Sequence, residues 1–457
     1  MFERLYEEYK SKRITADEAA ALVKNGYKIS FGANNTMARD IDIALSKRVK
    51  ELEGVTIYSK LNPMTKPFAT FEANIKDSTP EEFNKRIRFV SAHFGPQDRR
   101  MNKEGGCWFV PMLFNEYPSY MRDIIKPDIV FIQVGPMDTH GNFYYGPSIA
   151  GTTGEVEGAK TLVVEVNHSM PRAHGFKMTI PLSKVDYIVK GSGEPLPDWP
   201  PVTDIDEKDK KIAGLISPLI EDESTLQLGI GSLPTAIGQA LVDSDLNEIY
   251  CHTEVITDPY VDLFEAGKLH GNKYADEGKI VYSSVTGSRR VYEFVEDNPI
   301  CAVAPIDYIN NYTVISNIDR FISVNSCLCT DLYGQISSES IGYQHISGTG
   351  GQLDFVLGAY ASKGGKSFIC AHSVRELKDG RMISNIDPIL APGTIVSTPR
   401  AAVHYFATEY GVVNLKAKST YERAEALIGL AHPDFREDLI KEAEKMGIWT
   451  NTSKTTY

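Results

Sequence analysis

The sequence predicts an α/β protein made of two open α/β domains with mostly parallel sheets. Short runs rich in β-branched residues alternate with helix-like runs along the chain, and turn residues separate them. Continuous apolar strands between helices are typical of parallel sheets that carry helices on both faces. A proline-rich break near the middle divides this pattern into two halves.

The first half is expected to open with helices and continue with alternating strands. Thr15-Ala16-Asp17-Glu18 is a capping-box sequence, so a helix is expected to follow Thr15. Strands are expected at residues 28–31, 55–58, 87–90, 129–134 and 162–166.

The proline-rich break is interpreted as a domain boundary. Four prolines among residues 195–201 form a stiff, extended segment. The predicted parts are an N-terminal domain of residues 1–194, a linker of residues 195–205 and a C-terminal domain of residues 206–457. The second half restarts with a helix near residues 208–220, and the tail is expected to form two helices on either side of residues 431–434.

Composition narrows the classes of partner. The 457 residues are 42% hydrophobic and 24% charged, as in a soluble globular protein. The formal charge of −12 argues against nucleic acid or an anionic membrane as partner. The six cysteines form no CxxC pair and are expected to be reduced. The charged N-terminus lacks a signal-peptide core and no apolar run could span a bilayer, so a cytoplasmic location is predicted.

Glu254 is the first candidate catalytic residue. It lies in residues 249–258, where an apolar strand-like run ends in a short polar turn. Residues 226–234 form another strand that breaks into the loop Gly229-Ile230-Gly231 and then a helix. The carboxyl ends of such strands line the ligand crevice of an open α/β sheet, so the carboxylate and the loop are expected to face one cleft.

A second glycine cluster is Ser347-Gly348-Thr349-Gly350-Gly351. Its backbone N–H groups are not shielded by Cβ atoms, so it can hold a phosphate or the oxyanion of a tetrahedral intermediate. A tight turn without ligand is the alternative for one such cluster alone, and a solvated side chain is the alternative for Glu254. Two glycine clusters together with a strand-end glutamate favour the functional interpretation.

Several other site types are excluded. Gly229-Ile230-Gly231 is no dinucleotide fingerprint, because Pro234 stands at the third glycine position. Lys363-Gly364-Gly365-Lys366-Ser367 is no P-loop, because Tyr360 stands where the first glycine is required. The chain has no zinc-ligand spacing and no GxSxG sequence, so neither a metal site nor a serine hydrolase is expected.

A glutamate in such a cleft can react with a bound thioester. Attack on the thioester gives an acyl-glutamyl anhydride of comparable energy, so neither metal nor ATP is required. Positioning and oxyanion stabilisation then supply the catalysis.

With these residues the chain resembles the acetyl-CoA hydrolase/transferase branch of the family I CoA-transferases, and within it the butyryl-CoA:acetate and 4-hydroxybutyrate CoA-transferases. The resemblance extends nearly from end to end. Its markers are residues 134–141, 164–167, 170–172, 226–234, 252–254, 307–310, 331–335, 347–355 and 432–435.

The resemblance implies two α/β domains of the CoA-transferase type, a homodimer or higher homo-oligomer, and acyl-CoA and a short-chain carboxylate as substrates without a tightly bound cofactor. Glu254 falls on the family's catalytic glutamate. Asn310 and Gly350 fall on positions that contact the oxyanion or thioester. The positions implied to contact CoA are Gly229, Ile230, Gly231, Ser232, Leu233, Leu328, Gly348, Gly351 and Gln352.

Two segments depart from the family pattern. Residues 32–37, expected to border the acyl pocket, are unlike the corresponding loops, and Asn311-Tyr312 replaces a common His-Pro pair. Both departures concern the choice of acyl group rather than the reaction.

Three functions are compatible with these residues. The first hypothesis is a butyryl-CoA:acetate CoA-transferase that forms an anhydride and then a CoA thioester on Glu254 with ping-pong kinetics. Its alternatives are a CoA-transferase for 4-hydroxybutyrate or another short-chain acyl group, and an acyl-CoA hydrolase in which water intercepts the anhydride. A non-catalytic acyl-CoA or nucleotide-binding regulator would not need Glu254, so this residue argues against it.

Overall fold

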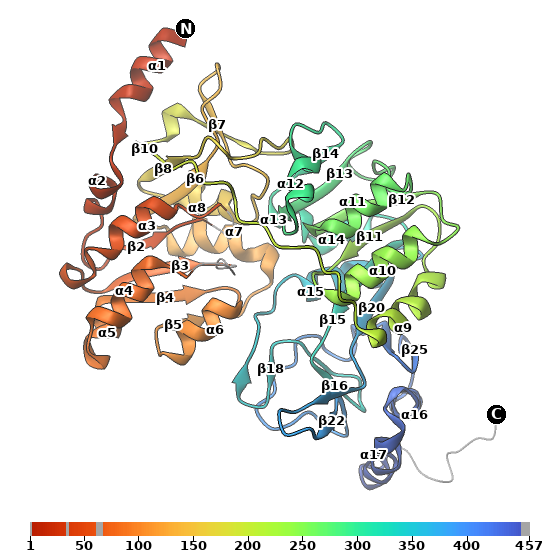
Figure 1. The fold of residues 1–457 in the computed structure, drawn as a ribbon. Helices are drawn as coiled ribbons and strands as arrows, with labels where there is room; N and C mark the ends of the chain where they lie inside the picture. Colours follow the sequence, from red (N-terminus) through yellow and green to blue (C-terminus); the bar gives the residue numbers. More distant parts are fainter. Residues whose placement is uncertain (1, 33–35, 61–66, 449–457) are drawn as a thin grey trace. The chain divides into compact units, whose positions relative to one another are not determined.

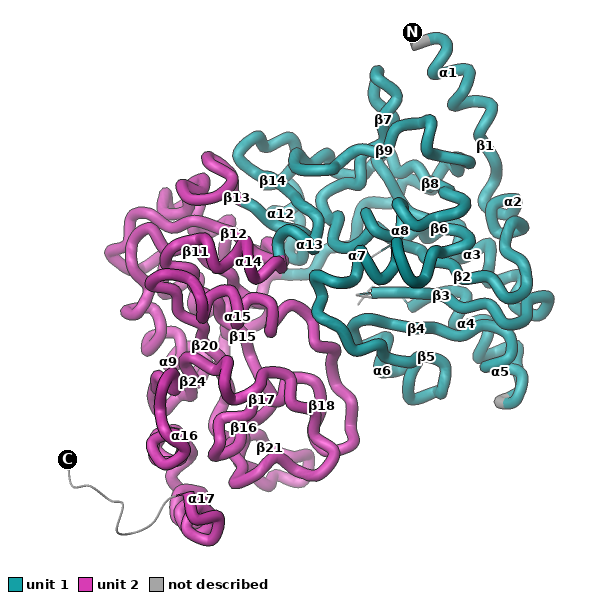
Figure 2. Tube along the Cα trace, turned by 180° about the vertical axis from the view of Figure 1, so that it is seen from behind, with its two compact units in different colours: residues 1–200, 281–309 teal, residues 201–280, 310–457 magenta. Residues whose placement is uncertain are grey.

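The chain forms two compact units, coloured teal and magenta in Figure 2. A computed structural model describes residues 2–32, 36–60 and 67–448. Unit 1 comprises residues 1–200 and 281–309, and unit 2 comprises residues 201–280 and 310–457. The chain therefore leaves unit 1, returns to it for one segment, and leaves it again.

Unit 1 is built on an eight-stranded sheet with the order β1-β10-β8-β6-β2-β3-β4-β5 (Figure 1). Neighbouring strands pair in parallel, with Ile29 opposite Ile57 and Phe131 opposite Val163. Its strands are β1 (Arg13–Ile14), β2 (Lys28–Ser30), β3 (Val55–Ser59), β4 (Ile87–Ser91), β5 (Cys107–Phe109), β6 (Ile129–Val134), β8 (Leu162–Val166) and β10 (Tyr187–Lys190). All five strands predicted for the first half are present.

The central and outer strands of this sheet differ in burial. Strands β6 and β8 are buried along their whole length, as expected for a parallel sheet covered on both faces. In β3, Val55 and Ile57 are buried whereas Thr56 and Tyr58 are partly exposed. One face of the sheet is therefore less completely covered at β3, where apolar and polar residues alternate in the sequence.

Unit 1 also contains a set of helices and a few further strands. They are α1 (Phe2–Ser11), α2 (Ala16–Ala21), α3 (Arg39–Ser46), η2 (Val49–Glu51), α4 (Ala69–Asp77), α5 (Pro80–Arg86), α6 (Pro96–Lys103), η3 (Phe114–Glu116), α7 (Tyr117–Ser119), η4 (Tyr120–Ile125), α8 (Thr152–Gly158), η5 (Leu182–Lys184), α12 (Arg289–Val295) and α13 (Ile306–Ile309). Its remaining strands are β7 (Asn142–Tyr144) and β9 (Thr179–Pro181), which pair with each other, β13 (Ile280–Val285) and β14 (Cys301–Val303).

Helices α2, α3, α4 and α5 share one apolar core with the sheet. This core includes Ala20 of α2, Leu45 of α3 and Phe71 of α4, packed with Ile57 and Phe89 of the strands. The predicted capping box is confirmed, because the Thr15 side chain accepts from the Glu18 N–H and the Glu18 carboxylate accepts from the Thr15 N–H.

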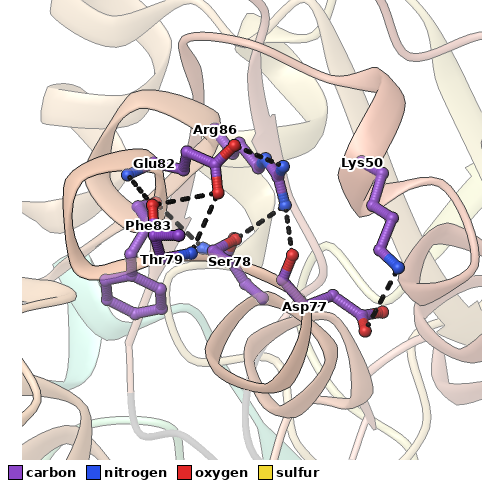
Figure 3. A network of polar contacts seen from close by, with 8 residues as sticks. Lys50, Asp77, Ser78, Thr79, Glu82, Phe83 and Arg86 are labelled. Carbon is purple, nitrogen blue, oxygen red and sulfur yellow. Dashed lines mark hydrogen bonds and ion pairs between the residues drawn. The ribbon is translucent and has the colours of Figure 1, made fainter.

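A second capping box shapes the turn between α4 and α5 (Figure 3). The Thr79 hydroxyl accepts from the Glu82 N–H at 3.3 Å, and the Glu82 carboxylate accepts from the Thr79 N–H at 2.9 Å. Arg86 then reaches back and donates to the Asp77 carbonyl at 2.6 Å and to the Ser78 hydroxyl at 2.9 Å. These bonds satisfy backbone groups at both helix ends, so a turn of two residues suffices between α4 and α5.

Unit 2 contains a run of six strands in the order β12-β11-β15-β20-β24-β25. All neighbours pair in parallel except β24 and β25, which confirms the predicted mostly parallel α/β class. These strands are β11 (Ser224–Leu228), β12 (Ile249–Ile256), β15 (Phe321–Ser326), β20 (Lys366–Cys370), β24 (Tyr405–Thr408) and β25 (Gly411–Asn414).

Helices and small sheets complete unit 2. The helices are α9 (Glu207–Ile216), η6 (Ser217–Leu219), α10 (Ser232–Val242), α11 (Asp258–Glu265), α14 (Tyr312–Ser316), α15 (Gln352–Ala361), α16 (Thr420–Leu430) and α17 (Pro433–Lys445). The short strands are β16 (Cys329–Asp331), β17 (Ile336–Ser337), β18 (Ser340–Ile341), β19 (Gln344–His345), β21 (Val374–Glu376), β22 (Met382–Ser384) and β23 (Ile386–Asp387). The two predicted tail helices are α16 and α17.

All six cysteines carry free thiols and five of them are buried, as the sequence predicts. Among the described residues, no helix has both the length and the apolar character needed to cross a membrane. Of the loop at residues 32–37, which was expected to border the acyl pocket, residues 33–35 lie outside the described part of the chain.

Candidate active site

Glu254 lies inside strand β12 rather than in the turn that follows it. The last residue of β12 that pairs with β11 is Cys251, opposite Leu226. Glu254 is three positions further along, where β12 extends beyond its neighbour, and its side chain is half-buried. Because the strands are parallel, this end of β12 is the carboxyl edge of the sheet, where open α/β sheets bind ligands.

The side chain of Asn310 holds the Glu254 carboxylate. Its Nδ2 donates a hydrogen bond to Glu254 Oε2 at 2.7 Å, and Asn310 itself is fully buried. Asn310 is the first residue of the second segment of unit 2. The structure therefore brings together two predicted site residues that are 56 positions apart in the sequence.

The backbone of Gly351 lies directly against the side chains of Glu254 and Asn310. A Cβ atom added at Gly351 would lie 1.9 Å from Glu254 Oε2 and 2.3 Å from Asn310 Nδ2. Both distances are far below any real contact, so a glycine is required for the close approach of the carboxylate to the backbone. Gly350 has a φ of +57°, a left-handed conformation that glycine adopts readily. The second glycine cluster thus ends directly against Glu254.

Burial raises the pKa of Glu254 to about 7, and the hydrogen bond from Asn310 opposes part of this rise. Removal of a carboxylate from water disfavours its charged form, whereas a donated hydrogen bond favours it. Both protonation states of Glu254 are consequently populated near neutral pH. A carboxylate of this pKa is a stronger base, and a better nucleophile, than an ordinary glutamate.

The first glycine loop, residues 229–231, joins β11 to α10, whose first two residues are Ser232 and Leu233. It is anchored at its start, because the Leu228 N–H donates to the Tyr260 hydroxyl at 2.8 Å. Gly231 has a φ of +111° and directly precedes Ser232, the first residue of α10. Strand β11 lies beside β12, so this loop follows the strand that neighbours the one carrying Glu254. Free N–H groups at the start of a helix attract anions such as phosphate groups.

The other predicted CoA positions lie on loops of unit 2 or, for Gln352, at the start of a helix. Leu328 lies between β15 and β16, and its N–H donates to the Ser337 carbonyl at 2.8 Å. Gly348 belongs to the second glycine cluster, and Gln352 begins α15 immediately after Gly351. Their contacts with CoA stay predictions.

Sequence reasoning missed two polar groups of this region. Asp354, which is fully buried, accepts from Asn310 Nδ2 at 3.3 Å. Near the first glycine loop, His372 Nε2 lies 2.8 Å from Asp209 Oδ1, and this bond raises the pKa of the His372 ring. An acid in the apolar run Leu353-Asp354-Phe355 was the one available signal for Asp354. Nothing local connects Asp209 with His372, which are 163 positions apart.

Within the described residues, no cluster of three or more His, Cys, Asp or Glu side chains is arranged to hold a metal ion.

Comparison with known proteins defines the class of the chain. Residues 2–197 match the acetyl-CoA hydrolase/transferase N-terminal domain, and residues 287–443 match the C-terminal domain of the same family. The chain is similar to the butyryl-CoA:acetate CoA-transferase of Anaerostipes caccae, with 42% identity over 98% of this chain and 99% of that protein. It is also 42% identical to the probable butyrate:acetyl-CoA coenzyme A-transferase of Syntrophomonas wolfei, over 99% of this chain and 100% of that protein.

A solved structure is also similar to this chain in fold and sequence. RipA from Yersinia pestis superposes with a TM-score of 0.85 and 32% identity, covering 97% of this chain and 99% of that one. The matches define an enzyme of the CoA-transferase class. The chain belongs to the acetyl-CoA hydrolase/transferase family, which confirms the resemblance seen in its sequence.

Substitution Gly351→Ala tests the close packing at this site. The added methyl group would occupy the position of the Glu254 carboxylate, so the carboxylate must move. We expect the CoA-transferase activity, measured as the rate of CoA transfer from acyl-CoA to a carboxylate, to fall roughly 100-fold or more. Catalysis depends on sub-ångström placement of the reacting group. Gly429→Ala, on α16 where a Cβ meets nothing within 4 Å, is the matched control and should retain activity. Normal activity of Gly351→Ala would contradict the geometry described above.

Substitution Glu254→Gln tests the cost of burying the charge. The folded-state pKa of about 7 exceeds the ordinary pKa of 4.5 for a glutamate. The favourable contribution of Glu254 to the free energy of unfolding is therefore complete below pH 4.5 and is lost as the pH rises through 7. The glutamine side chain of Glu254→Gln is neutral at every pH, so this variant does not lose stability as the pH rises. The full shift corresponds to roughly 3 kcal/mol, and partial solvent access reduces the expected gain at pH 8 to about 1–2 kcal/mol.

Thermal unfolding of both proteins at pH 5 and pH 8 measures this gain. Glu254→Gln should unfold at a higher temperature than the parent at pH 8, with a much smaller difference at pH 5. An equal difference at the two pH values would mean that the pKa of Glu254 is not raised.

Proposed function

We propose that this protein transfers CoA between a short-chain acyl group, of the butyryl type, and acetate. Support comes from relatives named as butyrate and acetate CoA-transferases, which align with the chain over almost its entire length. A protein named as a 4-hydroxybutyrate coenzyme A transferase from Clostridium kluyveri is 37% identical over 96% of this chain. The identities favour the butyryl type over the 4-hydroxybutyryl type.

The observation that carries the proposal is the environment of Glu254. Its carboxylate is held at 2.7 Å by Asn310 and is packed against the backbone of Gly351, at the carboxyl edge of a parallel sheet. A fully solvated glutamate without hydrogen-bond partners would have neither a fixed position nor a raised pKa. Both properties are those of an activated nucleophile.

The reaction begins with attack of a Glu254 oxygen on the carbonyl carbon of the acyl-CoA. The carbon–sulfur bond breaks, CoA leaves as a thiolate, and an acyl-glutamyl anhydride remains. The thiolate then attacks the glutamyl carbonyl of the anhydride, which releases the first carboxylic acid as its anion and leaves CoA as a thioester on Glu254. No proton, metal or nucleotide is consumed.

The second half of the reaction reverses these steps with acetate. An acetate oxygen attacks the glutamyl-CoA carbonyl and expels the thiolate, which gives an acetyl-glutamyl anhydride. The thiolate attacks the acetyl carbonyl, acetyl-CoA leaves, and the Glu254 carboxylate is regenerated. Each tetrahedral intermediate carries a negative oxygen, and we propose the Asn310 amide and the Gly350 N–H as its donors. The N–H groups of residues 229–233 are proposed to bind CoA.

Substitution Glu254→Ala tests the assignment of the nucleophile. Loss of the attacking oxygen should lower the transfer of CoA from butyryl-CoA to acetate by at least roughly 1,000-fold. CoA binding, measured by calorimetry, should persist because the glycine loops are unchanged. Glu425→Ala is the control, because Glu425 is an exposed glutamate on α16. Substantial transfer by Glu254→Ala would remove the proposal.

Omission of acetate separates a transferase from a hydrolase. A transferase should stop after the enzyme has been converted once to its CoA thioester, whereas a hydrolase should continue to consume butyryl-CoA at the same rate. Steady turnover without acetate would replace the transferase assignment with hydrolysis by the same glutamate.

The pH dependence of the first half-reaction tests the ionisation of Glu254. The ionised carboxylate is the nucleophile, so kcat/KM for acyl-CoA should be maximal above the pKa of about 7 and fall roughly tenfold per pH unit below it. The pKa should be higher in Asn310→Ala, because the hydrogen bond from Asn310 lowers it. An acid limb near pH 4.5 would show that burial does not perturb Glu254 in the free enzyme.

A further inference from the structure

Asp354 is a buried acid next to the candidate active site that the proposed reaction does not use. It lies in the first turn of α15, three residues after Gly351, and is fully buried. Its Oδ2 accepts a hydrogen bond from Asn310 Nδ2 at 3.3 Å. The same nitrogen donates to Glu254 Oε2 at 2.7 Å, so one amide group connects two carboxylates.

The two ends of the Asn310 amide have different hydrogen-bonding properties, so the orientation of the amide matters. The NH₂ group of Asn310 has two hydrogens, one for each carboxylate, whereas its Oδ1 can only accept. An ionised carboxylate also only accepts, so a reversed amide would place Oδ1 against two acceptors. An ionised Asp354 thus makes the reversed orientation unfavourable in either protonation state of Glu254.

We infer that Asp354 is a positioning residue that fixes the orientation of the Asn310 amide, so that its NH₂ group always faces the reacting carboxylate. The inference rests on the proposed function, because it assigns Asp354 to the same reaction. When Glu254 is consumed in the anhydride or the thioester, its carboxylate no longer holds the amide. Asp354 is unchanged by these steps and keeps the NH₂ group directed at the reacting carbonyl throughout the cycle.

The alternative role for Asp354 is stabilisation of helix α15, and it predicts a different effect of substitutions on activity. A negative charge in the first turn of a helix interacts favourably with the helix dipole, and Asp354 occupies such a position in α15. A role limited to helix stability would act independently of Asn310. The two roles therefore differ in whether the effects of substitutions at Asp354 and Asn310 are coupled.

A double-mutant cycle of Asp354→Asn and Asn310→Ala tests the inference, with kcat and the KM for butyryl-CoA measured for each variant. Asp354→Asn has nearly the same shape as the original residue and lets the Asn310 amide adopt either orientation. We expect its kcat to fall roughly 10- to 100-fold with little change in KM. In the Asn310→Ala background, Asp354→Asn should cause almost no further loss.

The controls separate the possible failures. Asp434→Asn removes an acid from the first turn of α17 and should leave kcat within about twofold. Should Asp354→Asn not fold, Asp354→Ser is used in the same cycle. The positioning role would be overturned if the two substitutions lowered kcat independently, so that the loss in the double variant equalled the product of the two single losses. An unchanged kcat for Asp354→Asn would overturn it as well. A fully active Glu254→Ala would instead overturn the proposed function itself.

Discussion

The contact of the Glu254 carboxylate with the Asn310 amide and the backbone of Gly351 is the constraint on which the site depends. The three residues come from β12, from the start of the second segment of unit 2, and from the N-terminus of α15. They meet because parallel strands present their carboxyl ends at one edge of the sheet. Since a methyl group at position 351 would overlap the carboxylate, the backbone path of the second glycine cluster is fixed by the same contact.

Buried carboxylates elsewhere in the protein show what distinguishes Glu254. In unit 1, Glu165 has its pKa raised to about 7 by burial, yet it accepts from the backbone N–H groups of Arg39 and Ile41 at the start of α3. Its hydrogen-bonding capacity is used for helix capping. Glu254 accepts one hydrogen bond among the described residues, from Asn310, which leaves its other oxygen available for chemistry.

Local sequence patterns predicted the parts of the fold that depend on short-range chemistry. The Thr15 capping box, strands β6 and β8, and the pair α16 and α17 follow from residue spacing, continuous apolar runs and turn residues. Glu254 and the glycine clusters were found because strand ends and glycine loops have a recognisable composition. The family resemblance supplied Asn310, which no local pattern connects with Glu254.

The features that sequence did not reveal all depend on long-range packing. Residues 281–309 belong to unit 1 although the chain on both sides of them belongs to unit 2. Lys60 and Glu155 form a fully buried ion pair at 2.5 Å, and the Tyr117 hydroxyl donates to the same carboxylate at 2.8 Å. In the sequence, Lys60 resembles an ordinary charge at a strand end. The role of Asp354 was hidden for the same reason, because its partner is 44 positions away.

Transfer of an oxygen atom from acetate to Glu254 tests the covalent mechanism most directly. When acetate attacks the glutamyl-CoA thioester and the thiolate then removes the acetyl group, one acetate oxygen stays on the Glu254 side chain. Turnover of butyryl-CoA with oxygen-18-labelled acetate, followed by mass spectrometry of the peptide that contains Glu254, should therefore show at least one heavy oxygen on this residue. Continued acetyl-CoA formation with no label on Glu254 would contradict the account.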